Sequence, residues 1–228
     1  MPKVIMLENR WMTFPALDAL PGFRHRFTLR HPAINVVDDR EVAIQRLSAW
    51  HADHVEELGF DRDGLRTVKQ VHGNEIVVIG GPPAPCATHD IPSDGIISNV
   101  PGIAIGIYVA DCCAVFLADP LTGAFGIVHS GKKGTESEIT AKAVKLMQGH
   151  FGSAPADIVV QLSPCIRPPA YEIDFAAEIR RQALKSGIQP GNLHDTGICT
   201  SSDPDRFYSY RMEKGRTGRM LAILGRPR

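Results

Sequence analysis

The chain has 228 residues, of which 43% are hydrophobic and 22% charged, a balance typical of a soluble globular protein. Its 25 Lys and Arg residues equal its 25 Asp and Glu residues, so a nucleic-acid partner bound through its phosphates is not expected. No apolar run reaches the length of a membrane span, and Glu8 and Arg10 fall where a signal peptide has its apolar core. The five cysteines are unevenly spaced, which does not indicate a secreted disulfide framework. We therefore expect a cytoplasmic protein with reduced thiols and no membrane partner.

In the first half of the chain, residues 41–58 predict a helix because their apolar side chains recur at helical spacing. Residues 65–79 predict a strand, a turn at His72-Gly73-Asn74 and a second strand. The segment 80–87 is rich in glycine and proline and predicts a loop inside one domain. The nearly continuous apolar run over 102–119 predicts buried strands that are broken near Asp111 and Cys112.

In the second half, residues 122–129 predict a strand ending at His129, followed by a glycine turn. A helix is predicted from about Thr135, which has capping-box spacing to Glu138. A strand over 158–162 and a helix capped by Asp174 follow, and the tail predicts a hairpin or ordered loop before a last strand. Strands and helices mixed without a regular βαβ rhythm indicate an α/β or α+β fold with a mixed sheet, in one domain over residues 1–228.

Three polar residues interrupt or end the apolar strands, and all three are metal ligands of the kind zinc prefers. They are His72, Cys112 and His129. One thiolate and two imidazoles leave a fourth zinc position open for water or substrate, which is the arrangement of a catalytic site. A lone histidine in a turn is more often a surface residue, so the prediction depends on the three segments converging. Asp111 is a candidate to orient a metal-bound imidazole, and Cys113 is interpreted as an inert buried side chain.

Several polar side chains near these ligands are candidates for binding a substrate. Lys132 or Lys133, together with the turn over 131–134, would hold an anion beside His129. Gln70 and Asn74 flank His72, and Arg167 follows a strand in a proline-rich loop. A late cluster of Arg211, Arg216 and Arg219 near two tyrosines is interpreted either as an anion or base-stacking site or as an ordinary surface strand. His51 and His54 share one helix face, which the neighbouring glutamates predict to be a solvated surface.

The motifs occur in a recognisable order from about residue 65 to the end of the chain: Q-V-H-G, A-D-C, V-H-S-G-K-K-G, S-P-C-I-R-P-P-A-Y-E and C-T-S-S-D-P-D-R-F-Y-S-Y-R with T-G-R. In this set and order the chain resembles the laccase-domain or polyphenol oxidase family, the YfiH-like proteins regarded as purine nucleoside enzymes. The resemblance assigns the family's metal ligands to His72, Cys112 and His129. It also implies a four-layer α/β/β/α fold.

The resemblance further implies a purine nucleoside phosphorylase that acts on adenosine, inosine and methylthioadenosine, with adenosine deaminase activity. Zinc is the implied metal, inorganic phosphate the co-substrate and a small purine nucleoside the partner. The family usually has H-A-G-W-R-G where this chain has H-S-G-K-K-G. Lys133 therefore stands in place of an arginine and is the candidate for its catalytic charge, without the bidentate fork.

Two other chemistries remain open at this point. A copper-binding polyphenol oxidase of the laccase type needs a large set of His ligands, mostly in H-x-H pairs, and the nine histidines here include no such pair. Copper can nevertheless compete with zinc for nitrogen and sulfur ligands. A metal-free hydrolase would use Cys112 as nucleophile and His129 as base. A binding protein that keeps the metal site without turnover is a further interpretation.

Overall fold

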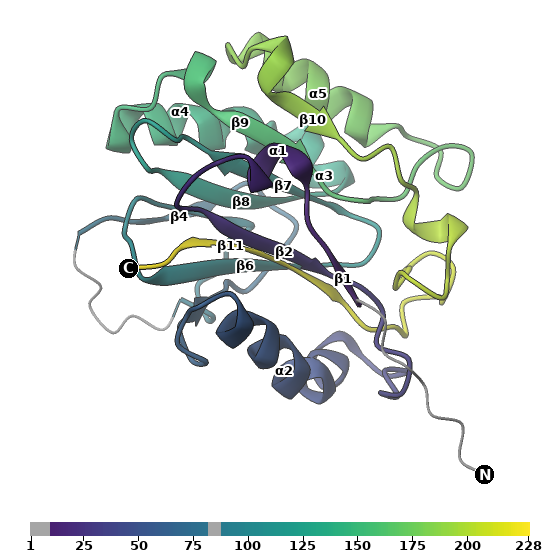
Figure 1. Cartoon of the computed structure of the whole chain (residues 1–228). Coiled ribbons are helices and arrows are strands. Elements are labelled where there is room, and N and C mark those ends of the chain that lie inside the picture. Colours follow the sequence, from purple (N-terminus) through teal and green to yellow (C-terminus); the bar gives the residue numbers. More distant parts are fainter. Residues whose placement is uncertain (1–9, 82–87) are drawn as a thin grey trace.

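The computed structural model describes residues 10–81 and 88–228. Two β-sheets lie face to face, and helices cover the outer face of each (Figure 1). The first sheet has the strand order β1-β2-β11-β6-β3 and the second β10-β9-β7-β8-β5-β4. Both sheets contain parallel and antiparallel pairs. The predicted mixed α/β class and four-layer α/β/β/α arrangement are confirmed.

The first sheet is built from the two ends of the chain and its middle. Its strands are β1 (Trp11–Met12), β2 (Arg24–Thr28), β3 (Leu65–Arg66), β6 (Ile103–Val109) and β11 (Met220–Arg226). The second sheet consists of β4 (Ile76–Ile79), β5 (Gly95–Ser98), β7 (Cys113–Ala118), β8 (Phe125–Ser130), β9 (Val159–Leu162) and β10 (Leu193–Asp195).

The long helix on the first sheet is α2 (Arg40–Glu57), and its N-cap Asp39 accepts a hydrogen bond from the Val42 amide. On the second sheet lie α3 (Lys132–Glu136), α4 (Ile139–Phe151) and α5 (Phe175–Lys185) (Figure 1). The remaining helical pieces are short: α1 (Pro15–Asp18), η1 (Pro155–Asp157), η2 (Pro190–Asn192) and η3 (Thr200–Ser202). None of the helices in the described ranges has the length and hydropathy needed to cross a membrane.

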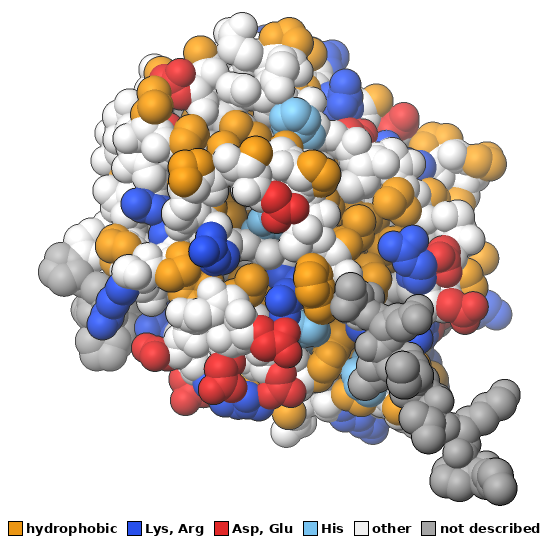
Figure 2. All heavy atoms as spheres, in the orientation of Figure 1, with side chains coloured by type: hydrophobic (Ala, Val, Ile, Leu, Met, Phe, Trp, Pro, Cys, Tyr) orange, Lys and Arg blue, Asp and Glu red, His pale blue; other side chains and the backbone are white. Residues whose placement is uncertain are grey.

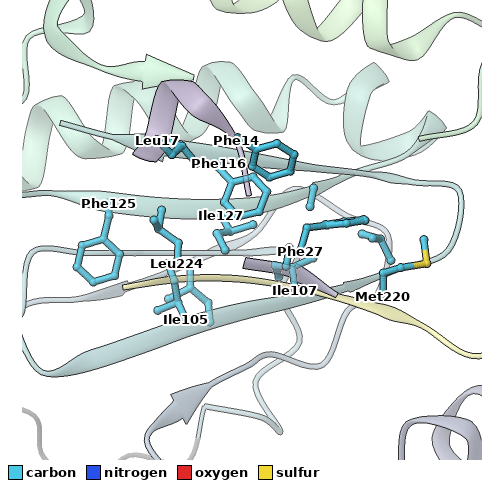
Figure 3. Close-up of a cluster of buried hydrophobic side chains, with 14 of the residues drawn as sticks. Phe14, Leu17, Phe27, Ile105, Ile107, Phe116, Phe125, Ile127, Met220 and Leu224 are labelled. Atoms are coloured by element: carbon cyan, nitrogen blue, oxygen red, sulfur yellow. The ribbon is translucent and has the colours of Figure 1, made fainter. Parts of the chain in front are cut away.

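The main hydrophobic core lies between the two sheets because each strand turns alternate side chains toward it. In β6 the isoleucines 103, 105 and 107 face this core, while Ala104 and Tyr108 face α2. Figure 3 shows side chains of both sheets meeting there, including Phe27, Ile107 and Leu224 from the first and Phe116 and Ile127 from the second. A second core between the β7–β8 region and helices α4 and α5 completes the layered packing.

The apolar run over 102–119 does break where the sequence predicts. β6 belongs to the first sheet and β7 to the second, so the chain crosses between the sheets at Ala110–Cys112. Asp111 makes this crossing with a φ of 80°, a conformation that non-glycine residues adopt rarely. Three hydrogen bonds to the Asp111 carboxylate stabilise this backbone conformation. They come from the Thr200 and Ser209 hydroxyls and the Arg211 amide.

Two local predictions need correction, and a third lies largely outside the described residues. The strands on either side of His72 form no hairpin, because β3 pairs in parallel with β6 and β4 pairs in parallel with β5 in the other sheet. The single helix predicted from Thr135 is two helices, α3 from Lys132 and α4 from Ile139. The Thr135 hydroxyl bonds to Ser130 instead of capping. Most of the predicted loop over 80–87, with Cys86, lies outside the described residues.

The face of α2 that carries His51 and His54 is buried against the first sheet and not solvated as predicted. Glu56 lies on the exposed side of the helix. Glu57 borders the buried face, because its carboxylate lies 3.7 Å from His54 Nδ1 and also pairs with Arg26. His54 Nδ1 lies 2.7 Å from Arg26 Nη1, and the His51 ring packs 5.6 Å from the Tyr108 ring. Burial lowers the pKa of His51 to about 3 and that of His54 to about 4, so both are neutral at pH 7.

The molecular surface carries both signs of charge. On the face that Figure 2 shows, Lys and Arg side chains are interspersed with Asp and Glu. This pattern agrees with the formal net charge of zero.

The central core should respond strongly to truncation of Phe116, which is fully buried and meets the Phe14 ring at a centroid distance of 5.3 Å. We expect Phe116→Ala to lower the free energy of unfolding by about 3–5 kcal/mol, because it leaves a cavity between the sheets. Urea unfolding measures the change. The control is Leu121→Ala in an exposed turn, where the side chain is 76% exposed and the change should stay within about 0.5 kcal/mol. Equal losses in both variants would contradict the layered packing.

Candidate active site

His72, Cys112 and His129 come together at one place although they lie in three separate parts of the chain. Their ligand atoms all lie within 4.8 Å of one another. His72 lies on the segment that joins β3 to β4, Cys112 is the last residue of the crossing from β6 to β7, and His129 lies near the end of β8. The geometry therefore meets the condition on which the predicted ligand set depends.

Asp94, which the sequence interpretation missed, holds two of these three residues in place. It lies immediately before β5 with its side chain fully buried. Its carboxylate accepts hydrogen bonds from the backbone amides of Val71 at 3.2 Å, His72 at 2.9 Å and Gly73 at 2.6 Å. It also lies 2.9 Å from Nδ1 of His129. A proton on Nδ1 leaves Nε2 of His129 as the ligand atom, which is how carboxylates commonly orient metal-binding imidazoles.

The same contacts fix the charge of Asp94. Burial alone raises the pKa of this carboxyl, but the hydrogen bond from His129 and the backbone amides of Gly73 and His72 outweigh burial and lower it. The segment around His72 is held in return, since His72 has a φ of 61° and needs these bonds to keep that backbone conformation.

In metal-free protein, Cys112 and His129 form a thiolate–imidazolium pair. Burial raises the pKa of the Cys112 thiol, but the charge of His129 and hydrogen bonds from both imidazoles lower it to about 6. Burial lowers the pKa of His129, but the Cys112 thiolate and the bond to Asp94 raise it to about 9. A thiolate in this setting is either a metal ligand or a nucleophile.

Gly131 gives the Cys112 thiol its space. A Cβ at position 131 would lie only 2.5 Å from Cys112 Sγ, so a larger residue would displace the sulfur. This explains why a glycine follows the strand that ends at Ser130.

A cavity of about 720 Å³ opens over the three residues. Four aromatic side chains and five cationic ones line it: Tyr108, Tyr171, Phe175 and Tyr210, and Arg40, Lys132, Arg211, Lys214 and Arg219. A concave, partly aromatic site with a few charged groups is the usual form of a small-molecule site.

The other candidate residues divide into those inside and outside this cavity. Gln70 and Arg211 line it. The Gln70 amide bonds to the backbone of Tyr108 in both directions, and its oxygen also accepts from Arg40 Nη2 at 3.2 Å. Asn74 and Lys133 are not among the lining residues, and the Asn74 amide donates to the Ser137 carbonyl. Arg167 is likewise outside, in an ion pair with Asp195.

Asp111 lies at the cavity, but its carboxylate does not contact either imidazole. Its partners are Thr200, Ser209 and the Arg211 amide. The orienting role that the sequence assigned to Asp111 therefore falls to Asp94. Asp111 instead anchors the segment that carries Tyr210 and Arg211 over the cavity. The signal for Asp94 was present in the sequence as an acidic residue directly before an apolar strand, but its partners are too distant along the chain to be recognised.

The space argument for Gly131 predicts a selective loss of metal binding. We expect Gly131→Ala to weaken zinc affinity by roughly 10- to 100-fold, because the added methyl group displaces the thiol. Competition with a chromogenic chelator measures the affinity. Gly149→Ala is the matched control, since no atom lies within 4 Å of a Cβ there. Equal zinc affinity in the two variants would show that the thiol is not held by this contact.

The pKa of Cys112 predicts its reactivity in metal-free protein. Because the thiol titrates at about 6 and His129 remains protonated up to about 9, the thiolate should be present across neutral pH. Iodoacetamide alkylation should show a phase that grows with pH with a midpoint near 6, and Cys112→Ala should remove it. A Cys112-dependent phase with the ordinary midpoint near 9.0 would contradict the charged pair.

Comparison with known proteins identifies the family of this chain. A family model described as multi-copper polyphenol oxidoreductase laccase matches residues 32–179 and 172–227. A purine nucleoside phosphorylase of Deinococcus radiodurans is 31% identical, over 95% of this chain and 96% of its own length. Purine nucleoside phosphorylase YlmD of Geobacillus stearothermophilus is 27% identical over 99% of this chain and 98% of its own. A crystal structure of YlmD from that organism matches with a TM-score of 0.82 at 25% identity, covering all of both chains. The chain therefore belongs to the laccase-like, YfiH-type family that its motifs predicted.

Proposed function

We propose that the protein is a zinc-dependent purine nucleoside phosphorylase acting on adenosine, inosine and methylthioadenosine, with adenosine deaminase activity at the same site. The observation that carries the proposal is the convergence of His72, Cys112 and His129 at the base of a cavity with aromatic and cationic walls. The relatives named purine nucleoside phosphorylase support the phosphorylase part of the proposal.

The donor set suits zinc. Two imidazole nitrogens and a thiolate are preferred zinc ligands, and three protein ligands leave a position for a small molecule. The Asp94 contact to His129 supports the ligand role, since it directs Nε2 of that ring toward the cluster. Bound there, zinc would supply Lewis acidity. Copper at the same residues is a competing occupant, because it binds nitrogen and sulfur ligands more tightly.

The chain's own residues would bind and orient the reactants. Rings such as Tyr171, Phe175 and Tyr210 offer faces against which a purine base can stack. Cationic side chains on the wall would hold inorganic phosphate and neutralise part of its charge. In phosphorolysis an oxygen of that phosphate forms the new bond to the anomeric carbon of the ribose, while the bond from that carbon to the purine nitrogen breaks.

We also propose a cytoplasmic location, on the basis of the cysteines. The four cysteines in the described ranges, Cys112, Cys113, Cys165 and Cys199, are all free thiols. Reduced thiols at a functional site suit a cytoplasmic protein.

A second candidate is a hydrolase in which Cys112 is the nucleophile and His129 the base. The thiolate–imidazolium pair favours it, because the pKa of Cys112 falls to about 6 and that of His129 rises to about 9. This function needs no metal, so metal content separates it from the first.

The test combines elemental analysis of untagged protein with chromatography of products from adenosine and inosine, with and without phosphate. We expect about one zinc per chain, with adenine and hypoxanthine released only when phosphate is present. Alanine at His72, Cys112 or His129 should remove both the metal and the activity. Phosphate-independent turnover by metal-free protein would select the cysteine hydrolase, and a variant that keeps full metal content would remove that residue from the ligand set.

A further inference from the structure

Two arginines distant in the sequence line the cavity from the first-sheet side. Arg40 is the first residue of α2, and Arg219 immediately precedes β11. Burial and then the positive charge of Arg40 lower the pKa of Arg219. Nothing in the order of motifs connects Arg40 with the active site.

Arg219 is fixed as a buried cation. The residue is only 7% exposed, and its Nη1 donates to the carbonyls of Thr217 at 2.6 Å and Gly218 at 2.9 Å. A Cβ at Gly218 would lie within 2.6–2.8 Å of the Tyr208 ring, so a glycine is required directly before this arginine. Within the described residues no carboxylate forms an ion pair with Arg219.

Arg40 is held toward the same cavity. Its Nη2 donates to Gln70 Oε1 at 3.2 Å, and the Gln70 amide is itself fixed by both backbone groups of Tyr108. The carboxylate that pairs with Arg40 is that of Glu41. Arg40 Nη1 lies 3.5 Å from Glu41 Oε1, and the Glu41 side chain is 77% exposed. An exposed pair of this kind neutralises little charge.

The two carboxylates that line the cavity, those of Asp39 and Asp111, already accept hydrogen bonds from other parts of the chain. The Asp39 carboxylate accepts from the Val42 amide as the cap of α2. The Asp111 carboxylate accepts from Thr200, Ser209 and the Arg211 amide. Two guanidinium groups thus line one partly desolvated cavity without a buried carboxylate partner, an arrangement that costs free energy unless an anion binds there.

We propose that Arg40 and Arg219 form the phosphate-binding subsite of the active site, with Gln70 as the residue that positions Arg40. A phosphate dianion accepts bidentate hydrogen bonds from guanidinium groups, and two of them match its charge. The inference deepens the proposed phosphorolysis and rests on it for the identity of the anion. Of the anion sites that the sequence suggested, the inference selects Arg219 from the late arginine cluster and adds Arg40, whereas Lys133 does not line the cavity.

The test is calorimetric titration of the protein as purified with inorganic phosphate. Wild type should bind phosphate, and Arg40→Gln and Arg219→Gln should each weaken binding at least about tenfold through loss of charged hydrogen bonds. Arg206→Gln is the matched control, since Arg206 is exposed in the same C-terminal segment and does not line the cavity. Its phosphate affinity should equal that of wild type.

Because Arg219 is buried, circular dichroism checks each variant, and Arg219→Lys provides a milder change that keeps the charge but loses the fork. A wild type that binds neither phosphate nor the nucleotide adenosine 5′-monophosphate, or Arg40→Gln and Arg219→Lys variants that bind both as wild type does, would overturn the subsite. A parallel titration with adenosine 5′-monophosphate separates the sources. If only that ligand depends on both arginines, the subsite stands but accepts the phosphate of a nucleotide.

A different result is expected if the subsite is correct but the protein is not a phosphorylase. Phosphate binding that depends on both arginines, with no base released from any nucleoside, would leave the subsite in place and remove phosphorolysis.

Discussion

The buried carboxylate of Asp94 is the contact on which the site depends. It receives three consecutive backbone amides from the segment around His72 and also contacts the ring of His129. Removing such a carboxylate would leave three partly buried backbone donors without this partner and would free two of the three metal-ligand candidates at once. A single side chain therefore couples the shape of a surface segment, the orientation of an imidazole and the charge state of the cluster.

The two-sheet architecture explains why such a contact is needed. The β6–β7 crossing and the β3–β4 connection each leave one sheet and enter the other, and the site forms where these two crossings meet the end of β8. Both crossings carry a residue with positive φ, Asp111 and His72. Each conformation is maintained by hydrogen bonds to a carboxylate, that of Asp111 in the first crossing and that of Asp94 in the second. Local strain is thus concentrated at the functional end of the sheets, as is common at active sites.

The sequence was informative where a pattern is local. The break near Asp111, the cap at Asp174 and the strands over 125–130 and 159–162 follow from periodicity and side-chain chemistry. The three ligand candidates followed from donor chemistry and the order of motifs. Partners that meet only through the fold were not accessible: the pairing of β3 and β4 with different sheets, the bonds of Asp94, and the presence of Arg40 and Arg219 at one cavity. His51 and His54 were misplaced for a related reason: packing against the first sheet buries them, and the neighbouring glutamates do not indicate which helix face meets that sheet.

That the ligand candidates lie on three separate segments, two of them crossings between the sheets, has a consequence for unfolding. An unfolded chain does not present them together, so a metal held by them would bind the native state alone and shift the folding equilibrium by mass action. At a free metal concentration of 100 times the dissociation constant, this linkage adds about 2.7 kcal/mol to the free energy of unfolding. The melting temperature would then report the metal supply as well as the packing of the sheets, and a chelator would act on this protein as a mild denaturant.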